Sequence, residues 1–213
     1  VAVGPDIHVL ATVFSPLTVA KQLIGRETLL EHLAHHAAEL HAGLRVVARS
    51  MARFAAATLR HGADGVFFAT QFARRDTLSP DQHEEFGQAY DRVVLEALAG
   101  TEALLLLHLC GRDVMLELAD GYGAHIVNWD DQAAGPRLSD GLAARRAGAV
   151  MGGLDRQRLL RVSPAEVSAD VRAIVSASGR RRLVIGAGCV TFQGTPLENQ
   201  VTVRAAAHDP HST

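Results

Sequence analysis

Short apolar segments alternate with longer amphipathic segments along the chain, and this alternation limits the possible folds more than any other feature. Six segments have the length and composition of buried strands: His8–Phe14, Gly65–Thr70, Ala103–Cys110, His125–Asp130, Ala149–Leu154 and Arg182–Cys189. Several of them are apolar on both faces, which is typical of strands in a parallel sheet that is covered on both sides. The repeated order of strand and helix predicts an α/β fold.

The segments between the strands carry signals for helix starts. Ser79 lies before a proline that suits the first position of a helix. Ser163–Glu166 and Thr195–Glu198 predict capping boxes, in which a hydroxyl and a later carboxylate satisfy free backbone N–H groups. The long amphipathic stretch Glu27–His61 predicts two helices joined near His41–Gly43.

Two α/β architectures fit this order, an open doubly wound sheet and a (β/α)8 barrel. A G-x-G-x-x-G motif after an early strand would favour the first, but the glycines of Gly186–Val190 come at the last strand with different spacing. The barrel is therefore preferred. Because a barrel has eight strands and only six are found in residues 1–213, we expect a single barrel domain that is incomplete. The chain does not begin with Met, so we expect the missing part to precede Val1.

Composition narrows the class of protein. The formal net charge is −2 and the basic residues are scattered, which does not match the electrostatic footprint of a nucleic-acid-binding protein. No segment approaches the ~20 apolar residues of a membrane span, and the first ten residues lack the basic start of a signal peptide. We therefore expect a cytoplasmic protein with no nucleic-acid or membrane partner. The unpaired edges of an incomplete barrel favour association, for example as a homodimer.

Candidate metal ligands lie at the ends of two predicted strands. His108 and Cys110 are two positions apart, so their side chains point to the same face, and Cys189 ends the last strand. In a barrel these strand ends surround one mouth. One imidazole and two thiolates suit a tetrahedral zinc ion with one open position. The alternative is that the cysteines are small buried apolar residues and the histidine belongs to the core.

Further polar residues are expected at the same mouth. Asn128 and Asp130 share a face at the end of the strand after His108, and they are our candidate catalytic residues. Asn128 either orients a ligand or satisfies a turn. Gln71 follows the second strand and either binds substrate or cofactor or caps a loop. Asp131 is the second candidate for binding substrate or cofactor, and its carboxylate is expected to pair with Arg137 or Arg156.

Five motifs resemble the uroporphyrinogen decarboxylase superfamily over essentially the whole chain. They are FSPLTVAKQLIG, GADGVFFATQ, LHLCG, GGLDR and GAGCVTFQGTPLEN. This superfamily contains the decarboxylase of the heme pathway and corrinoid-dependent methyltransferases that act on thiols, and a similar barrel occurs in cobalamin-independent methionine synthase. The resemblance implies a (β/α)8 barrel longer than this chain, in agreement with the incomplete pattern.

The motifs are closest to the methyltransferase branch. Those enzymes carry His-x-Cys at the end of one strand and a further cysteine near the last strand, and His108, Cys110 and Cys189 match these positions. Asp130 is the closest match to their acidic residue after the next strand, which implies a fourth ligand. The decarboxylases usually have Gly-His-Gly where this chain has Gly186-Ala187-Gly188, and their arginine motif would lie before Val1.

The resemblance implies a zinc-dependent methyltransferase. Zinc would bind a substrate thiol, whose free pKa is near ~8.5, and the resulting thiolate would accept a methyl group from a methyl-corrinoid carried by a partner protein. One alternative is cofactor-free decarboxylation of uroporphyrinogen or a similar tetrapyrrole in porphyrin biosynthesis. Another is a non-catalytic barrel fragment that is retained for association.

Overall fold

The computed structural model describes residues 4, 6–133, 135–179 and 181–208. Within them, six strands form a single sheet in which the order in space equals the order in sequence. The strands are β1 (Leu10–Phe14), β2 (Gly65–Thr70), β3 (Leu104–Leu109), β4 (Ile126–Trp129), β5 (Ala149–Leu154) and β6 (Leu183–Ala187). Each of the six predicted strand segments contains one of these strands, so the α/β prediction is confirmed.

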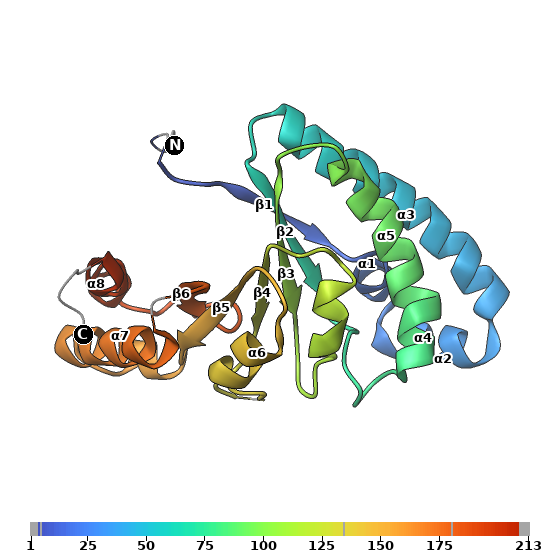
Figure 1. Ribbon diagram of the computed structural model, residues 1–213. Helices are drawn as coiled ribbons and strands as arrows, with labels where there is room; N and C mark the ends of the chain where they lie inside the picture. Colours follow the sequence, from blue (N-terminus) through green and yellow to red (C-terminus); the bar gives the residue numbers. More distant parts are fainter. Residues whose placement is uncertain (1–3, 5, 134, 180, 209–213) are drawn as a thin grey trace.

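All neighbouring strands pair in parallel, and the sheet curves without closing in the part of the chain that is described. β1 and β6 form its two edges. Figure 1 shows β1 running from the N-terminal segment toward α1, and β6 lying beside α8. The fold is a partial barrel of the TIM type with six strands, as expected from the sequence.

Helices follow the strands and cover the outer face of the sheet. They are α1 (Pro16–Ile24), α2 (Arg26–His35), α3 (Ala37–Arg60), α4 (Pro80–His83), α5 (Ala89–Leu95), α6 (Leu138–Ala144), α7 (Pro164–Ser178) and α8 (Leu197–His208). A π-helical turn, η1 (Glu84–Gln88), joins α4 to α5, and three short 3-10 turns are η2 (Glu96–Leu98), η3 (Leu116–Asp120) and η4 (Arg158–Leu160). Figure 1 shows α3 beside α5 at one end of the sheet and α7 beside α8 at the other.

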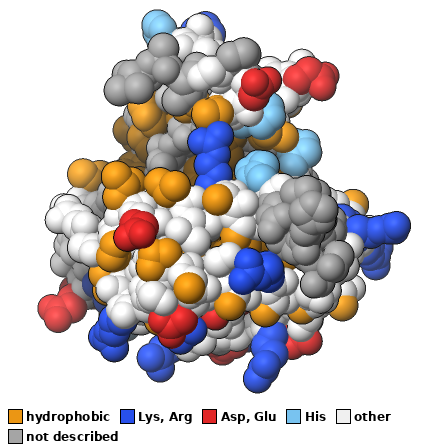
Figure 2. Space-filling view, turned by 90° about the vertical axis from the view of Figure 1, so that its left-hand side faces the viewer, with side chains coloured by type: hydrophobic (Ala, Val, Ile, Leu, Met, Phe, Trp, Pro, Cys, Tyr) orange, Lys and Arg blue, Asp and Glu red, His pale blue; other side chains and the backbone are white. Residues whose placement is uncertain are grey.

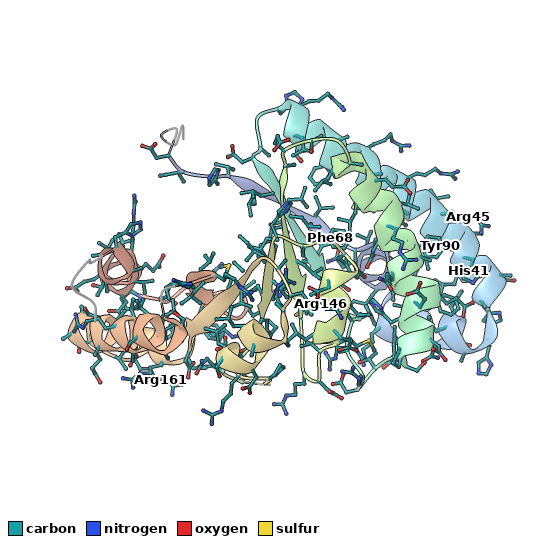
Figure 3. All side chains as sticks on the ribbon, viewed as in Figure 1. His41, Arg45, Phe68, Tyr90, Arg146 and Arg161 are labelled. Atoms are coloured by element: carbon teal, nitrogen blue, oxygen red, sulfur yellow. The ribbon has the colours of Figure 1, made fainter. Side chains whose placement is uncertain are left out.

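Polar contacts reinforce the packing of α3 against the helix that contains η1 and α5. The hydroxyl of Tyr90 forms a hydrogen bond with Nδ1 of His41 at 2.7 Å, and Nε2 of His41 lies 3.0 Å from the carboxylate of Glu85. The His41 ring also stacks on Phe86, with 4.7 Å between the ring centroids. Figure 3 shows His41 and Tyr90 on neighbouring helices at the edge of the molecule that lies far from β6.

Two of the predicted helix starts agree with the structure, and one does not. The hydroxyl of Ser163 accepts the N–H of Glu166, while the Glu166 carboxylate accepts the N–H of Ser163. Ser79 forms a comparable box. The capping box predicted at Thr195 is wrong, because its hydroxyl is buried and has no hydrogen-bond partner among the described residues. A turn in which the N–H of Thr195 bonds to Phe192 directs this side chain inward instead.

The junction predicted near His41–Gly43 is also wrong, although two helices do form. The break lies at His36, whose φ of −134° and ψ of 46° are not helical, and Gly43 stays inside α3. Leu33 of α2 and Leu40 of α3 lie in one apolar cluster. Because the chain turns at His36, both helices can direct their apolar stripes at that cluster.

Successive side chains of β3 point alternately to the helix-covered face of the sheet and to the interior of the partial barrel. Leu107 and Leu109 are fully buried in the cluster between the sheet and its helices. His108 lies between them and therefore faces the opposite side of the sheet. The described helices include none with the length and apolar character needed to cross a bilayer.

Candidate metal centre

Strand register places His108 in a row of residues that crosses the interior face of the sheet. Ala69 of β2 is opposite His108, His108 is opposite Asn128 of β4, and Asn128 is opposite Met151 of β5. Residues paired in this way in parallel strands point to the same face and are close neighbours. The pairing therefore fixes Asn128 as the immediate neighbour of the histidine.

The three residues predicted as zinc ligands come together in the structure. Donor atoms of His108, Cys110 and Cys189 all lie within 4.8 Å of one another. Nε2 of His108 is 3.8 Å from Sγ of Cys189. The N–H of Cys110 bonds to the carbonyl of Thr70 at 2.9 Å, so the strand pattern continues one residue beyond β3 and keeps Cys110 on the same side as His108. Residues 81 positions apart in the chain thus share one small site.

Hydrogen bonds to Asn128 determine which nitrogen of the imidazole is free. The Asn128 amide N–H groups donate to the carbonyls of Met151 at 2.9 Å and Ala187 at 3.1 Å. Its oxygen must therefore accept, and Nδ1–H of His108 donates to it at 2.6 Å. Nε2 is then the nitrogen directed at Cys189, where it can bind a metal ion once it carries no proton. Asn128 contacts the nitrogen of His108 that is turned away from the cysteines, and it fixes the orientation of the imidazole ring.

The two cysteines are held in different states. A hydrogen bond from the Cys110 thiol, followed by one with His108, lowers the pKa of Cys189 below its ordinary value. The same bond to Cys189, together with burial, raises the pKa of Cys110. One sulfur is therefore ready to bind a cation as a thiolate before the other has lost its proton.

A cavity of about 460 Å³ opens beside these donor atoms. Besides the ligand group it is lined by apolar side chains such as Phe14 and Phe67, and by Gln71. The Gln71 side chain accepts a hydrogen bond from Nζ of Lys21 at 3.1 Å. Figure 2, which faces the left-hand side of Figure 1, shows a hollow in the molecule with hydrophobic side chains on its walls. The site therefore combines soft metal ligands with space for a small molecule.

Comparison with known proteins assigns the chain to a family. The family model described as uroporphyrinogen decarboxylase (URO-D) matches residues 2–210. The chain belongs to the uroporphyrinogen decarboxylase family. Two curated relatives are methylcobamide:CoM methyltransferases MtaA, one from Methanosarcina barkeri (strain Fusaro / DSM 804) at 25% identity and one from Methanosarcina barkeri at 24% identity. Each alignment covers 98% of this chain and 60% of the relative.

A solved structure supports the same fold for this family member. A methyltransferase from Methanosarcina mazei superimposes with a TM-score of 0.79 at 22% sequence identity, covering 96% of this chain and 59% of the other. The chain thus spans about three fifths of the length of the relatives that it matches.

The structure places Asp130 near the ligand group of this URO-D family protein but not within it. Its Oδ1 accepts the N–H of Ala133 at 3.1 Å, and its Oδ2 lies 3.5 Å from Nη2 of Arg156. Among the described residues, the group of converging metal donors contains only the histidine and the two cysteines. The carboxylate of Asp130 is directed at an arginine.

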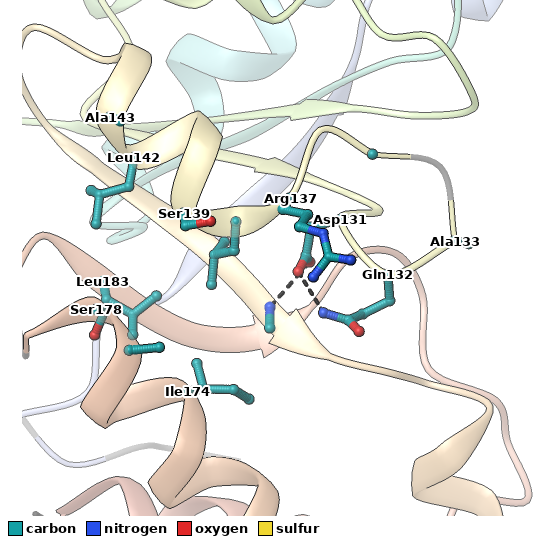
Figure 4. Close-up of a pocket in the computed structure, with 14 residues that line it drawn as sticks. Asp131, Gln132, Ala133, Arg137, Ser139, Leu142, Ala143, Ile174, Ser178 and Leu183 are labelled. Carbon is teal, nitrogen blue, oxygen red and sulfur yellow. Dashed lines mark hydrogen bonds between the residues drawn. The ribbon is translucent and has the colours of Figure 1, made fainter.

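Asp131 points into a different cavity, of about 700 Å³, between α6 and α7 (Figure 4). Its carboxylate accepts the N–H of Gly153 at 3.1 Å and the side-chain amide of Gln132 at 2.7 Å. Burial raises the pKa of this carboxyl above its ordinary value. Arg156 pairs with Asp130 instead, and within the described part of the chain no ion pair joins Asp131 to Arg137. Asp131 is therefore separated from the metal donors.

Two arginines lie near the cysteines; the sequence-based prediction did not include Arg74 and included Arg156 only as a partner of Asp131. Arg74 forms an ion pair with Asp76 and packs against Gly111, where a Cβ would lie 2.5 Å from Nη1 of Arg74. Gly111 has a φ of +115°, which favours glycine. Arg156 follows β5 within the GGLDR motif. Its position two residues beyond the end of β5, where residues of a barrel line the mouth, was the available signal for Arg156.

Proposed function

We propose that this chain carries the metal site of a zinc-dependent methyltransferase that transfers a methyl group to a thiol. The observation that carries the proposal is the convergence of one imidazole nitrogen and two sulfurs within 4.8 Å at the mouth of the partial barrel. The names of the curated relatives, methylcobamide:CoM methyltransferases, support the same class of reaction. By the same analogy, the methyl donor is a methyl-corrinoid on a partner protein.

The donor set fits zinc on chemical grounds. Zinc prefers nitrogen and sulfur ligands, and a catalytic zinc ion keeps one position for substrate. The Asn128 side chain holds His108 with Nε2 facing the cysteines, which removes the need to reorient the ring. When bound, zinc would lower the pKa of a substrate thiol so that it is present as the more nucleophilic thiolate.

The residues of the chain then have separate tasks. His108, Cys110 and Cys189 hold the ion, and Asn128 fixes the imidazole. The apolar walls of the cavity of about 460 Å³ exclude water around a small thiol. Gln71, held by Lys21 at the same cavity, hydrogen-bonds the substrate.

Metal analysis of three variants tests the proposal. We expect one equivalent of zinc in the purified chain and the loss of stoichiometric zinc in Cys110→Ala and Cys189→Ala. His35→Ala, at an exposed position on α2, serves as a matched control and should keep its zinc. Full retention of zinc in both cysteine variants would refute the proposal.

An activity assay separates methyl transfer from decarboxylation. The chain is incubated with methylcobalamin and coenzyme M, or with uroporphyrinogen, each with and without a chelator. Loss of the methyl group from methylcobalamin should require the metal and disappear with the chelator. Release of carbon dioxide that ignores the chelator would instead identify a decarboxylase.

A further inference from the structure

We infer that Arg156 is a positioning residue that fastens the loop carrying Cys189 to the end of β4. The inference concerns the metal site of the proposed function and rests on it. Cys110 extends a paired strand, whereas Cys189 lies in the connection between β6 and α8. The two sulfurs therefore depend on different parts of the structure for their positions.

The loop after β6 has little apolar anchoring of its own. Val190 is 78% exposed and Phe192 is 37% exposed, so neither side chain is buried in a core. A loop of this kind samples several positions unless polar contacts hold it. Cys189 immediately precedes Val190, so contacts to the backbone of Val190 determine where the sulfur lies.

Arg156, which follows β5, makes two contacts to this loop and one to Asp130. Its Nη1 donates to the carbonyl of Val190 at 3.2 Å, and its guanidinium lies over the ring of Phe192, 5.3 Å from the centroid. Its Nη2 lies 3.5 Å from Oδ2 of Asp130. One planar group thus joins the ends of β4 and β5 to the loop that follows β6, a task for which the fork of arginine is suited.

Asp130 is a fixed anchor for this arginine. Its second oxygen accepts the N–H of Ala133, and only 13% of its side chain is exposed. The loop also passes directly over it, because a Cβ at Gly188 would lie 2.4 Å from Cα of Asp130. Close packing at Gly188 and the arginine contacts to Val190 and Phe192 therefore act on either side of Cys189. Asp130 therefore serves the metal site through Arg156 and not as a ligand.

Loss of the guanidinium should free the loop and weaken metal binding. We expect Arg156→Ala to increase amide hydrogen exchange over residues 189–193 in the metal-free chain. Zinc affinity, measured by competition with a chromophoric chelator, should fall about 10- to 100-fold, the usual effect of removing a residue that orients a metal ligand. Arg156→Lys retains the charge beside Asp130 but cannot match the planar fork, so it should restore the affinity only in part.

Arg158→Ala is the matched control. Arg158 is two residues further along and pairs with Asp170 on the surface at 2.6 Å, so its loss should leave both measurements unchanged. Unchanged exchange and affinity in Arg156→Ala would overturn the inference. If the unmodified chain binds no zinc, the proposed function fails, while the exchange measurement still decides the role of Arg156.

A double variant separates an anchor from a ligand. If Asp130 acts through Arg156, zinc binding by Asp130→Ala combined with Arg156→Ala should be no weaker than by Arg156→Ala alone. A multiplicative loss of affinity in the double variant would mean that Asp130 contacts the ion directly, and the assignment of Asp130 would be wrong. The absorption spectrum of the Co²⁺-loaded chain gives an independent readout, because its thiolate charge-transfer band should weaken when Cys189 is displaced.

Discussion

A buried carboxyl group makes the stability of this protein depend on pH. Asp91 of α5 is completely buried. The hydroxyl of Tyr122 donates to its Oδ2 at 2.6 Å, while Oδ1 has no hydrogen-bond partner among the described residues. Burial raises the pKa of Asp91 from an ordinary 3.8 to about 7, because a charge in the core is poorly solvated. The folded protein therefore holds a proton that the unfolded chain releases.

The sign and size of the effect follow from linkage. Between about pH 4 and pH 7 the folded state binds one more proton than the unfolded state, so the free energy of unfolding falls as the pH rises. The shift of about three units corresponds to a loss of roughly 4 kcal/mol by neutral pH, at 1.36 kcal/mol per unit. Above pH 7 the loss is complete and no longer changes.

Asp91→Asn should remove this loss. The amide stays neutral, and its oxygen can still accept the hydrogen bond from Tyr122. The quantity to compare is the free energy of unfolding of the variant minus that of the unmodified chain. We expect this difference to be larger at pH 8 than at pH 5 by roughly 3 kcal/mol, because the unmodified chain loses stability over the two pH units between pH 5 and pH 7. Urea unfolding at both pH values gives the free energies.

Asp6→Asn, at an exposed position, provides the control and should have nearly the same effect at both pH values. The comparison of variant with unmodified chain cancels contributions from other titrating groups. If the relative stability of Asp91→Asn is the same at pH 5 and pH 8, Asp91 is ionised in the fold throughout this range and the reasoning is refuted.

Three further variants test other parts of the structure. Asn128→Ala leaves His108 without the acceptor that fixes its ring, so chelator competition should show zinc affinity reduced about 10- to 100-fold; unchanged affinity would contradict the orienting role. Gly111→Ala forces a φ of +115° on a residue with a Cβ that meets Arg74, so urea unfolding should show a loss of about 1–3 kcal/mol, and an unaltered midpoint would contradict it. His83 is buried with both ring nitrogens unpartnered among the described residues, and burial lowers its pKa to about 4, so stability is lost as the pH falls from about 6.5 toward 4. His83→Leu should therefore gain stability relative to the unmodified chain on going from pH 8 to pH 5, and no gain would contradict this.

Periodicity and motif spacing predict much of the framework. The six strand segments follow from apolar runs, because a strand buried on both faces must be apolar throughout. The His-x-Cys spacing places His108 and Cys110 on one face, since side chains alternate along a strand. Cys189 is the third candidate because it ends the last predicted strand, and the resemblance matches it to a cysteine of the methyltransferases. Ser163 and Glu166 predict a capping box because the contact spans a single helical turn.

Only the tertiary structure decides which distant groups become partners. The helix break at His36, not near Gly43, depends on an apolar cluster to which several helices contribute. Asp130 and Asp131 are adjacent in sequence, yet one faces Arg156 and the other a cavity between α6 and α7. The role of Asn128 depends on carbonyls in β5 and β6 that fix its amide.

There is a physical reason why the sequence predicts the elements but not the contacts between distant residues. Periodicity and caps report interactions between residues a few positions apart, and each short segment contains all the atoms involved. The chain by itself therefore determined the order of strands and helices and the soft ligands at the strand ends. The meeting of Cys189 with His108, the tautomer of the imidazole and the partner of each carboxylate depend on packing between segments up to 81 residues apart. Those contacts exist only once the sheet has brought its strand ends to one mouth.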